Sequence, residues 1–213
     1  MNRFTSFVTS SIGKKLVMAV TGLGFCAFLA GHLAGNLTLF AGEAAFNSYA
    51  ERLHALGPLL LVAEIGLLVF AILHVSTGLF LFYKNFQARP KRYSVKKKAG
   101  GRTLGSQTMP YTGLLLLLFV VMHLADFHFV DKTDRTIFEI VSATFSTPLY
   151  VFLYIAAVII AAFHVSHGFW SAFQTMGLNH PKYMPAIRRI GILFSVAVGA
   201  GFGLIPIYIS LTL

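Results

Sequence analysis

Residues 74–78 read His74-Val75-Ser76-Thr77-Gly78, and a near copy, His164-Val165-Ser166-His167-Gly168, follows 90 residues later. Both copies lie deep inside long apolar runs, where an ionisable side chain is costly and is usually functional. A second echo relates His32-Leu33-Ala34 to His123-Leu124-Ala125, with a step of 91 residues. The chain is therefore predicted to be a duplicated pair of helices, with one intramembrane histidine in each of four helices.

The composition is that of a protein embedded in lipid. The 213-residue chain is 56% apolar and 11% charged, whereas a soluble domain carries about 25% charged residues. The formal net charge of +10 does not indicate a nucleic-acid partner, because the basic residues flank the apolar runs. The single cysteine, Cys26, lies in the first apolar run and is expected to be a packing residue.

Five apolar stretches are long enough to cross a bilayer, which takes about 20 residues. They cover residues 16–38, 59–83, 110–130, 148–172 and 190–212. The chain is therefore predicted to be an all-α integral membrane protein with a single domain over residues 1–213. The first four helices carry the paired histidines and form the core, and the fifth, which has none, supports them. The first stretch shows no signal-peptide cleavage pattern and is expected to be a retained helix.

The basic residues predict the orientation of the chain. Fourteen of the 17 Lys and Arg residues fall on one side of a five-span topology. By the positive-inside rule, the N-terminus is cytoplasmic and the C-terminus faces outward. The basic segment 84–109 is either a solvated topological anchor or a docking surface for an acidic cytoplasmic partner. On the outer side, segment 39–58 is expected to hold a short amphipathic helix with Phe46, Tyr49 and Leu53 on one face.

The depths of the four histidines predict two pairs. Counted along the helices from the cytoplasmic side, His74 and His164 lie roughly 14 Å in, His123 roughly 20 Å and His32 roughly 25 Å. His74 and His164 thus share an inner level, and His32 and His123 share an outer level. Two paired histidine levels in one bundle are typical of two b-type haems, which axial ligation and burial would tune.

Small residues lie near these histidines and could leave helix surfaces open for a porphyrin, although glycine also supports close helix packing. The glycines concerned are Gly24, Gly31, Gly35, Gly78, Gly113 and Gly168. His167, three residues after His164, is an alternative ligand, a propionate contact or a packed polar residue.

Further polar residues lie near the outer level. Glu64 falls near the outer end of the second helix, and His54 and His128 lie near the outer surface. An intramembrane acid is a functional candidate, and a quinone headgroup needs polar contacts and a proton route. Glu64 and His54 are therefore candidate quinone or proton contacts, although Glu64 could instead snorkel to the interface. Asp126 and Glu51 are weaker candidates of the same kind.

Several motifs in this chain resemble those of one family. They are Gly31-His32-Leu33, the EAAFNS stretch from Glu43 to Ser48, His74 with Gly78, His123, and Phe163 to Ser171 (FHVSHGFWS). Together they resemble the cytochrome b membrane-anchor subunit of succinate dehydrogenase and fumarate reductase, in its five-helix, di-haem form. The resemblance covers essentially the whole chain, and the FHxSxGxWS pattern is its most specific part.

The resemblance implies two haem b groups, with His32 and His123 as ligands of the distal haem and His74 and His164 as ligands of the proximal one. It implies a bacterial cytoplasmic membrane location, with a flavoprotein subunit and an iron–sulfur subunit on the cytoplasmic face. Electrons would pass between the iron–sulfur clusters and menaquinone or ubiquinone, and dicarboxylate chemistry would take place on the flavoprotein. Dimerisation of the whole complex is compatible with this assembly. The second histidine, His167, departs from the family pattern.

Two other functions stay open at this point. One is a stand-alone transmembrane di-haem electron carrier without soluble subunits, for which the basic segment 84–109 would be idle. The other is a histidine-lined metal or proton channel, for which metal binding or ion flux is expected without a haem spectrum. The duplicated pairing of histidines favours haem over a channel.

Overall fold

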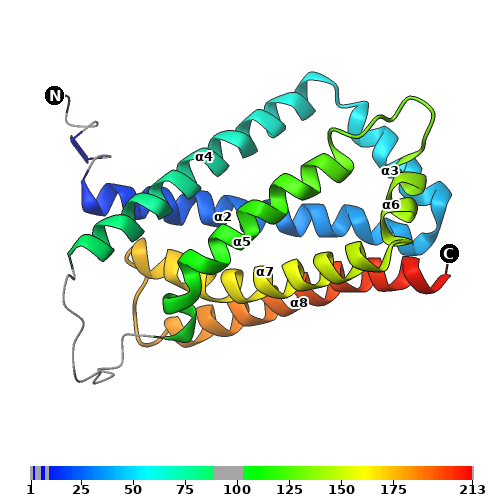
Figure 1. Cartoon of the computed structure of the whole chain (residues 1–213). Helices are drawn as coiled ribbons and strands as arrows, with labels where there is room; N and C mark the ends of the chain where they lie inside the picture. The colour runs from blue at the N-terminus through cyan, green and yellow to red at the C-terminus, as the bar shows by residue number, and fades with distance from the viewer. Residues whose placement is uncertain (1, 3–5, 8–9, 89–102, 213) are drawn as a thin grey trace.

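The computed structural model describes residues 2, 6–7, 10–88 and 103–212, and this part of the chain is all-helical. Five long helices dominate it (Figure 1): α2 (Ser11–Asn36), α4 (Pro58–Gln87), α5 (Leu104–Phe127), α7 (Pro148–Thr175) and α8 (Met184–Thr212). Three short helices lie together at one end: η1 (Leu37–Ala41), α3 (Glu43–His54) and α6 (Ile137–Phe145).

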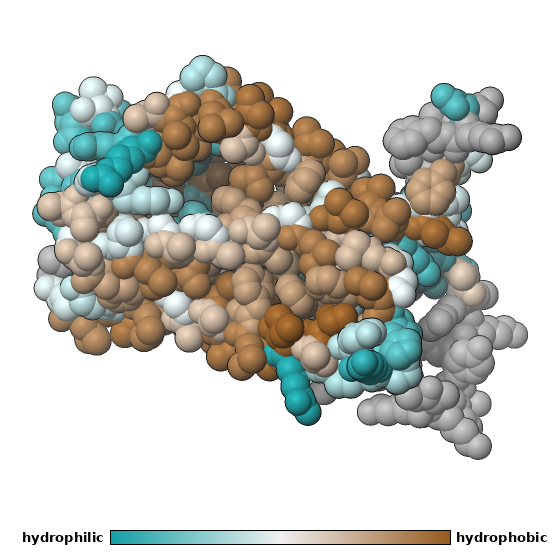
Figure 2. Space-filling view, turned by 180° about the vertical axis from the view of Figure 1, so that it is seen from behind, coloured by the Kyte–Doolittle hydropathy of each residue, from teal (hydrophilic) through white to brown (hydrophobic). Residues whose placement is uncertain are grey.

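The five long helices have the length and the composition needed to cross a membrane. The described residues contain five such spans of 23 to 31 residues, which confirms the predicted all-α fold with five apolar helices. Figure 2 shows apolar side chains covering the middle of the molecule, with polar side chains gathered at its two ends. No residue of α4 is buried. Such an extensive apolar surface is that of a multi-pass membrane protein, because lipid rather than water covers it.

Each long helix extends past its predicted apolar stretch at one end or both, although α2 and α5 stop short of it at the other end. In α2, Ser10 caps the first turn by accepting a hydrogen bond from the backbone N–H of Gly13 at 3.0 Å. In α5, Thr103 caps a helix that begins at Leu104, continues through Pro110 and ends at Phe127, so residues 128–130 lie outside it. Backbone groups inside a membrane must bond within their own helix, which favours helices longer than their apolar segments.

Four of the long helices form a ring, and the fifth packs outside it. Helix α2 packs beside both α4 and α7, and α5 packs beside α7 and, more loosely, α4. Helices α2 and α5 are therefore diagonal partners across the bundle, and so are α4 and α7. Helix α8 lies along α7 and also contacts α2 (Figure 1), which is the supporting position predicted for it.

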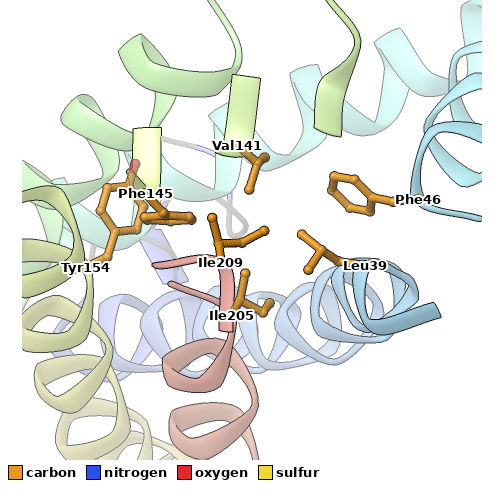
Figure 3. Close-up of a cluster of buried hydrophobic side chains, with 7 residues drawn as sticks. All are labelled: Leu39, Phe46, Val141, Phe145, Tyr154, Ile205 and Ile209. Atoms are coloured by element: carbon orange, nitrogen blue, oxygen red, sulfur yellow. The ribbon is translucent and has the colours of Figure 1, made fainter. Parts of the chain in front are cut away.

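A buried apolar cluster closes one end of the bundle (Figure 3). Its seven members come from η1, α3, α6, α7 and α8, and they are Leu39, Phe46, Val141, Phe145, Tyr154, Ile205 and Ile209. The predicted short helix in segment 39–58 is confirmed as α3, and its Phe46 is only 4% exposed. Helix α3 is joined to α6 by a hydrogen bond of 3.1 Å from the backbone N–H of Phe138 to Asn47 Oδ1. Most of the basic segment 84–109, residues 89–102, lies outside the described residues.

Candidate functional site

The outer two histidines face each other across the bundle. The rings of His32 on α2 and His123 on α5 lie 5.9 Å apart between centroids, with their planes at 89°. Aromatic side chains flank His32: Phe28 stacks on it at 5.1 Å, and Phe202 of α8 lies 5.5 Å away. The structure thus brings together the pair that the sequence assigned to the outer level.

Aromatic packing also surrounds the second member of this outer pair. Phe127 and Tyr154 lie 5.2 and 6.0 Å from the His123 ring. The Nδ1 atom of His123 is buried and has no hydrogen-bond partner in the part of the chain that the structure describes. On the other side, His32 Nδ1 lies 3.4 Å from the amide nitrogen of Asn36, a donor group that also bonds the His32 carbonyl at 2.8 Å. Neither Nδ1 atom has an acceptor within bonding distance among the described contacts.

The inner two histidines are held differently. The Nδ1 atom of His74, on α4, lies 3.0 Å from the hydroxyl of Thr21 on the neighbouring helix α2. The Nδ1 atom of His164, on α7, lies 3.0 Å from the hydroxyl of Thr112 on the neighbouring helix α5. Both contacts join a histidine to the adjacent helix of its own repeat, so the two halves of the chain repeat this detail.

A glycine adjoins each of these two contacts. A Cβ atom on Gly22 would lie 3.2 Å from His74 Cε1, and one on Gly113 would lie 3.4 Å from His164 Cε1. The sequence analysis missed this pattern, although the sequence contains it. A Thr-Gly dipeptide occurs at residues 21–22 and again at 112–113. In each repeat, its threonine lies 11 residues before the outer-level histidine. Extending the repeat search beyond the histidines would have found it.

Other glycines near the histidines have different roles. The space beside Gly24 is filled by Phe70, and that beside Gly35 by Tyr49, so both of these glycines serve helix packing. A Cβ atom on Gly31, next to His32, would meet nothing within 4 Å. The predicted open helix surface therefore fits Gly31 and does not fit Gly24 or Gly35.

The donor set fits an iron porphyrin. Two imidazoles facing each other are the axial ligands of a b-type haem, and the porphyrin itself supplies the remaining ligands. A bare metal ion bound by protein alone needs more side chains. Within the described ranges, no group of three or more His, Cys, Asp or Glu side chains gathers in a way that could hold one. The open surface at Gly31 also suits a site that another group completes.

His167 lies at the edge of this arrangement. Its Nδ1 is 3.4 Å from the hydroxyl of Thr103, and its ring meets Trp170 edge-on at 4.9 Å. Trp170 in turn stacks under the guanidinium of Arg188, 4.5 Å from the ring centroid. His167 is therefore packed toward the start of α5, whereas His164 bonds Thr112 further along the same helix.

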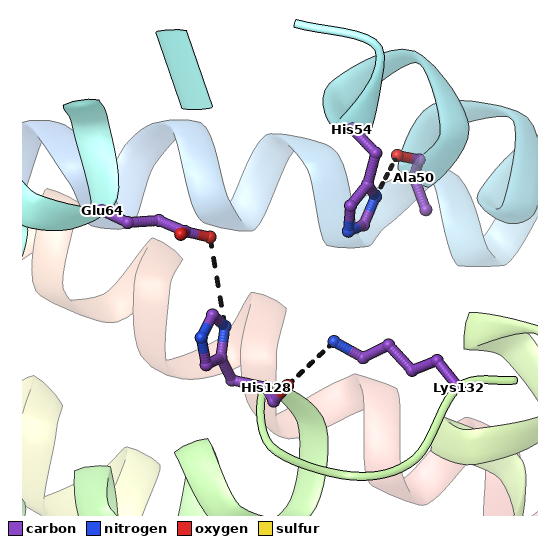
Figure 4. Close-up of polar contacts among 5 residues, drawn as sticks. All are labelled: Ala50, His54, Glu64, His128 and Lys132. Carbon is purple, nitrogen blue, oxygen red and sulfur yellow. Dashed lines mark hydrogen bonds and ion pairs between the residues drawn. The ribbon is translucent and has the colours of Figure 1, made fainter. Parts of the chain in front are cut away.

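The outer polar residues form two separate arrangements (Figure 4). Glu64 Oε1 lies 4.0 Å from His128 Nδ1, and both side chains are nearly half exposed. Lys132 donates a hydrogen bond of 3.0 Å to the carbonyl of His128. His54 Nδ1 instead bonds the carbonyl of Ala50 in its own helix at 2.7 Å. The structure thus joins Glu64 to His128 and ties His54 to α3.

An acid and a tyrosine lie next to the outer pair. The Tyr154 hydroxyl donates a hydrogen bond of 2.7 Å to Asp126 Oδ2, and its ring is 5% exposed. Asp126 also lines a cavity of about 320 Å³ together with Arg135 and Tyr150. Sequence reasoning assigned no role to any aromatic residue and therefore missed Tyr154. Glu51, the other weak candidate, is exposed on α3.

Comparison with known proteins gives one distant relative. The succinate dehydrogenase cytochrome b558 subunit of Bacillus subtilis (strain 168) is 26% identical over 177 residues, which cover 80% of this chain and 81% of the relative. The chain is a distant homologue of that subunit. The resemblance indicated by the motifs is thereby confirmed. No family model matches the chain, and no solved structure matches it.

Proposed function

We propose that this chain is the di-haem cytochrome b membrane anchor of a succinate:quinone oxidoreductase. The observation that carries the proposal is the facing pair His32 and His123, 5.9 Å apart on diagonal helices of a five-span bundle. The distant relationship to a cytochrome b558 subunit points the same way.

In this proposal, His32 and His123 hold the outer, distal haem, and His74 and His164 hold the inner, proximal one. When bound, the two haems supply one-electron carriers at two depths of the membrane. The chain orients their ligands through diagonal helix pairs and keeps water away with apolar and aromatic side chains. The hydrogen bond between His164 Nδ1 and the Thr112 hydroxyl favours His164 over His167 as the fourth ligand.

The partners follow from the same proposal. A flavoprotein subunit and an iron–sulfur subunit would sit on the cytoplasmic face, to which the positive-inside rule assigns the basic sequence 84–109. The N-terminus is then cytoplasmic, the C-terminus faces outward, and a complex of this kind can dimerise. Menaquinone or ubiquinone would exchange electrons near the outer haem. Glu64 and His128, within 4.0 Å, are the best-placed proton groups, with His54 nearby on α3.

The first experiment counts haem in the purified protein and identifies what copurifies with it. We expect two b haems per chain in a pyridine haemochrome assay, together with a flavoprotein and an iron–sulfur protein. Two haems without soluble partners would favour the stand-alone electron carrier. Protein without haem that binds a metal ion or conducts ions would contradict the proposal and favour a channel.

A second experiment tests the quinone contact. Glu64→Gln removes the carboxylate but keeps its shape, and Asp134→Asn is the control because Asp134 is an exposed acid that is not a candidate contact. We expect Glu64→Gln to reduce quinone-linked turnover at least about a hundredfold, the lower end of what a general acid–base group contributes. Succinate oxidation with a soluble dye should stay unchanged. Unchanged quinone turnover would remove Glu64 as a contact.

A further inference from the structure

The hydroxyl of Thr21 takes part in three short contacts. It lies 2.7 Å from the carbonyl of Val17 and 3.2 Å from that of Met18, both in the preceding turn of α2. It also lies 3.0 Å from His74 Nδ1. A hydroxyl has one proton to donate and two lone pairs that accept. Because the nearest carbonyl takes that proton, the oxygen is left to accept a hydrogen bond from His74 Nδ1–H.

The second repeat has the same arrangement. The hydroxyl of Thr112 lies 3.0 Å from the carbonyl of Thr108 and 3.2 Å from that of Met109. It lies 3.0 Å from His164 Nδ1, the same separation as in the first repeat. Two independent occurrences of one geometry, 91 residues apart, indicate a feature of the site rather than an accident of packing.

A hydrogen bond at Nδ1 determines what the other ring nitrogen can do. A neutral imidazole carries one proton, so a proton held on Nδ1 leaves the lone pair of Nε2 free to bind a metal. The bond also fixes the rotation of the ring. Gly22 and Gly113 fit this role, because each leaves room beside the Cε1 atom of the histidine that its neighbouring threonine holds.

We propose that Thr21 and Thr112 are positioning residues that hold His74 and His164 in the Nδ1–H tautomer and lower the reduction potential of the inner haem. This inference rests on the proposed function, because it concerns how the inner pair ligates iron. An acceptor at Nδ1–H makes the imidazole a stronger electron donor through Nε2. A stronger donor stabilises oxidised iron relative to reduced iron. Among the described residues the outer pair has no such acceptor, so we expect the effect at the inner haem alone.

The test uses valine, which keeps the shape of threonine but removes the hydroxyl. The variants are Thr21→Val, Thr112→Val and the double variant, made in the full chain with its copurifying subunits. Thr38→Val is the matched control, because the Thr38 hydroxyl also donates to a carbonyl three residues earlier, that of Gly35 at 2.7 Å, and bonds no histidine among the described residues. Thr21→Ser and Thr112→Ser restore the hydroxyl and should behave as the wild type.

The measurements are the haem count, the midpoint potential of each haem and the electron paramagnetic resonance spectrum of the oxidised protein. Each valine variant should retain two haems and raise the inner potential, and the double variant should raise it further. The expected shift is about tenfold in the oxidised-to-reduced ratio at a fixed potential, which for one electron is about 59 mV. The spectrum of the inner haem should change with ring orientation, and the outer haem should keep its wild-type values.

The outcomes separate this inference from the function on which it rests. A wild-type protein without haem overturns both. A wild-type protein with two haems, whose inner potential and spectrum are the same in both valine variants, overturns the inference alone. If a valine variant loses the inner haem, its serine counterpart decides: retention of haem at the wild-type potential supports the hydrogen bond, and loss in both variants overturns it.

Discussion

The inner and outer histidine pairs come from the same duplicated helix unit but are held by different interactions. In the inner pair, each Nδ1 atom lies 3.0 Å from a threonine hydroxyl on the neighbouring helix of its repeat. In the outer pair, aromatic rings surround both imidazoles, and the Nδ1 of His123 is buried without a partner among the described residues. The two predicted repeats therefore share the positions of their histidines, while the inner and outer pairs have different surroundings.

In the proposed function, this difference would give two ways of tuning one kind of haem ligand. A hydrogen bond is directional, so it fixes ring rotation and electron donation together. Aromatic packing is far less directional, and it acts through burial and the exclusion of water. We expect the potential of the inner site to respond to single hydroxyl groups and that of the outer site to respond to changes in packing.

The largest expected effect comes from removing one ligand of each pair. His74→Ala should lose the inner haem and keep the outer one, and His123→Ala should do the reverse, so each variant retains half of the haem. Pyridine haemochrome counts and the potential of the remaining haem would show this. His167→Ala is the control and should keep both haems. If His167→Ala loses one haem and His164→Ala loses none, the assignment of the fourth ligand is wrong.

A smaller effect is expected from filling the space beside the rings. In Gly22→Ala, the new Cβ would lie 3.2 Å from His74 Cε1, so the ring must move by a few tenths of an ångström. In Gly31→Ala, the new Cβ meets no atom of the described chain within 4 Å. We expect Gly22→Ala to shift the reduction potential of the inner haem by about as much as the loss of one threonine–histidine hydrogen bond. That shift is about tenfold in the ratio of oxidised to reduced haem.

Gly31→Ala distinguishes lipid from cofactor on that face of α2. A full haem content in this variant would place the Gly31 surface against lipid, whereas loss of the outer haem would place it against the porphyrin. Loss of the inner haem would contradict the assignment of Gly31 to the outer level.

The outer pair offers a third test through Tyr154. Tyr154→Phe removes the hydroxyl that donates to Asp126 at 2.7 Å but keeps the ring beside His123. The carboxylate loses a donor, yet it lines an open cavity that can admit water, so the loss of stability should be about 1 kcal/mol. Thermal unfolding in detergent would measure it. The outer haem should keep its potential, because the aromatic packing stays. A shift as large as that of Thr21→Val would show that the outer site is also tuned by hydrogen bonds.

The helices and the two histidine levels could be predicted from the sequence, because similar motifs recur at a spacing of 90 to 91 residues. The echoes around His32, His74, His123 and His164 were sufficient to predict the helices and the two levels, because apolar length and helical rise determine depth. Two aromatic neighbours of His123, Phe119 and Phe127, lie four residues away on α5 and follow from helical spacing. Tyr154 was not predictable, because it comes from α7 and reaches His123 only through the packing of α7 against α5. The start of α5 at Leu104 was also missed, since hydropathy does not detect a polar first turn capped by Thr103.

The smallest expected effect concerns the outer loop rather than either pair. The Thr133 hydroxyl donates to Asp131 Oδ1 at 2.6 Å and its backbone N–H donates at 3.0 Å, and these bonds lower the pKa of Asp131. Because the pKa of Asp131 is lower in the folded state, these bonds stabilise the fold at pH values above the ordinary carboxyl pKa of about 4. That stabilisation is lost as the pH falls through the folded-state pKa.

Thr133→Val should therefore raise the pKa of Asp131 toward its ordinary value, which a carbon-13 titration of the carboxyl group would show. Because Asp131 is fully exposed, water screens its charge and global stability should barely change. Neither haem potential should change as Asp131 titrates, because neither proposed haem site includes an exposed loop carboxylate. If the outer potential does follow it, charge in the outer loop, and not only the aromatic rings around His32 and His123, tunes the outer site.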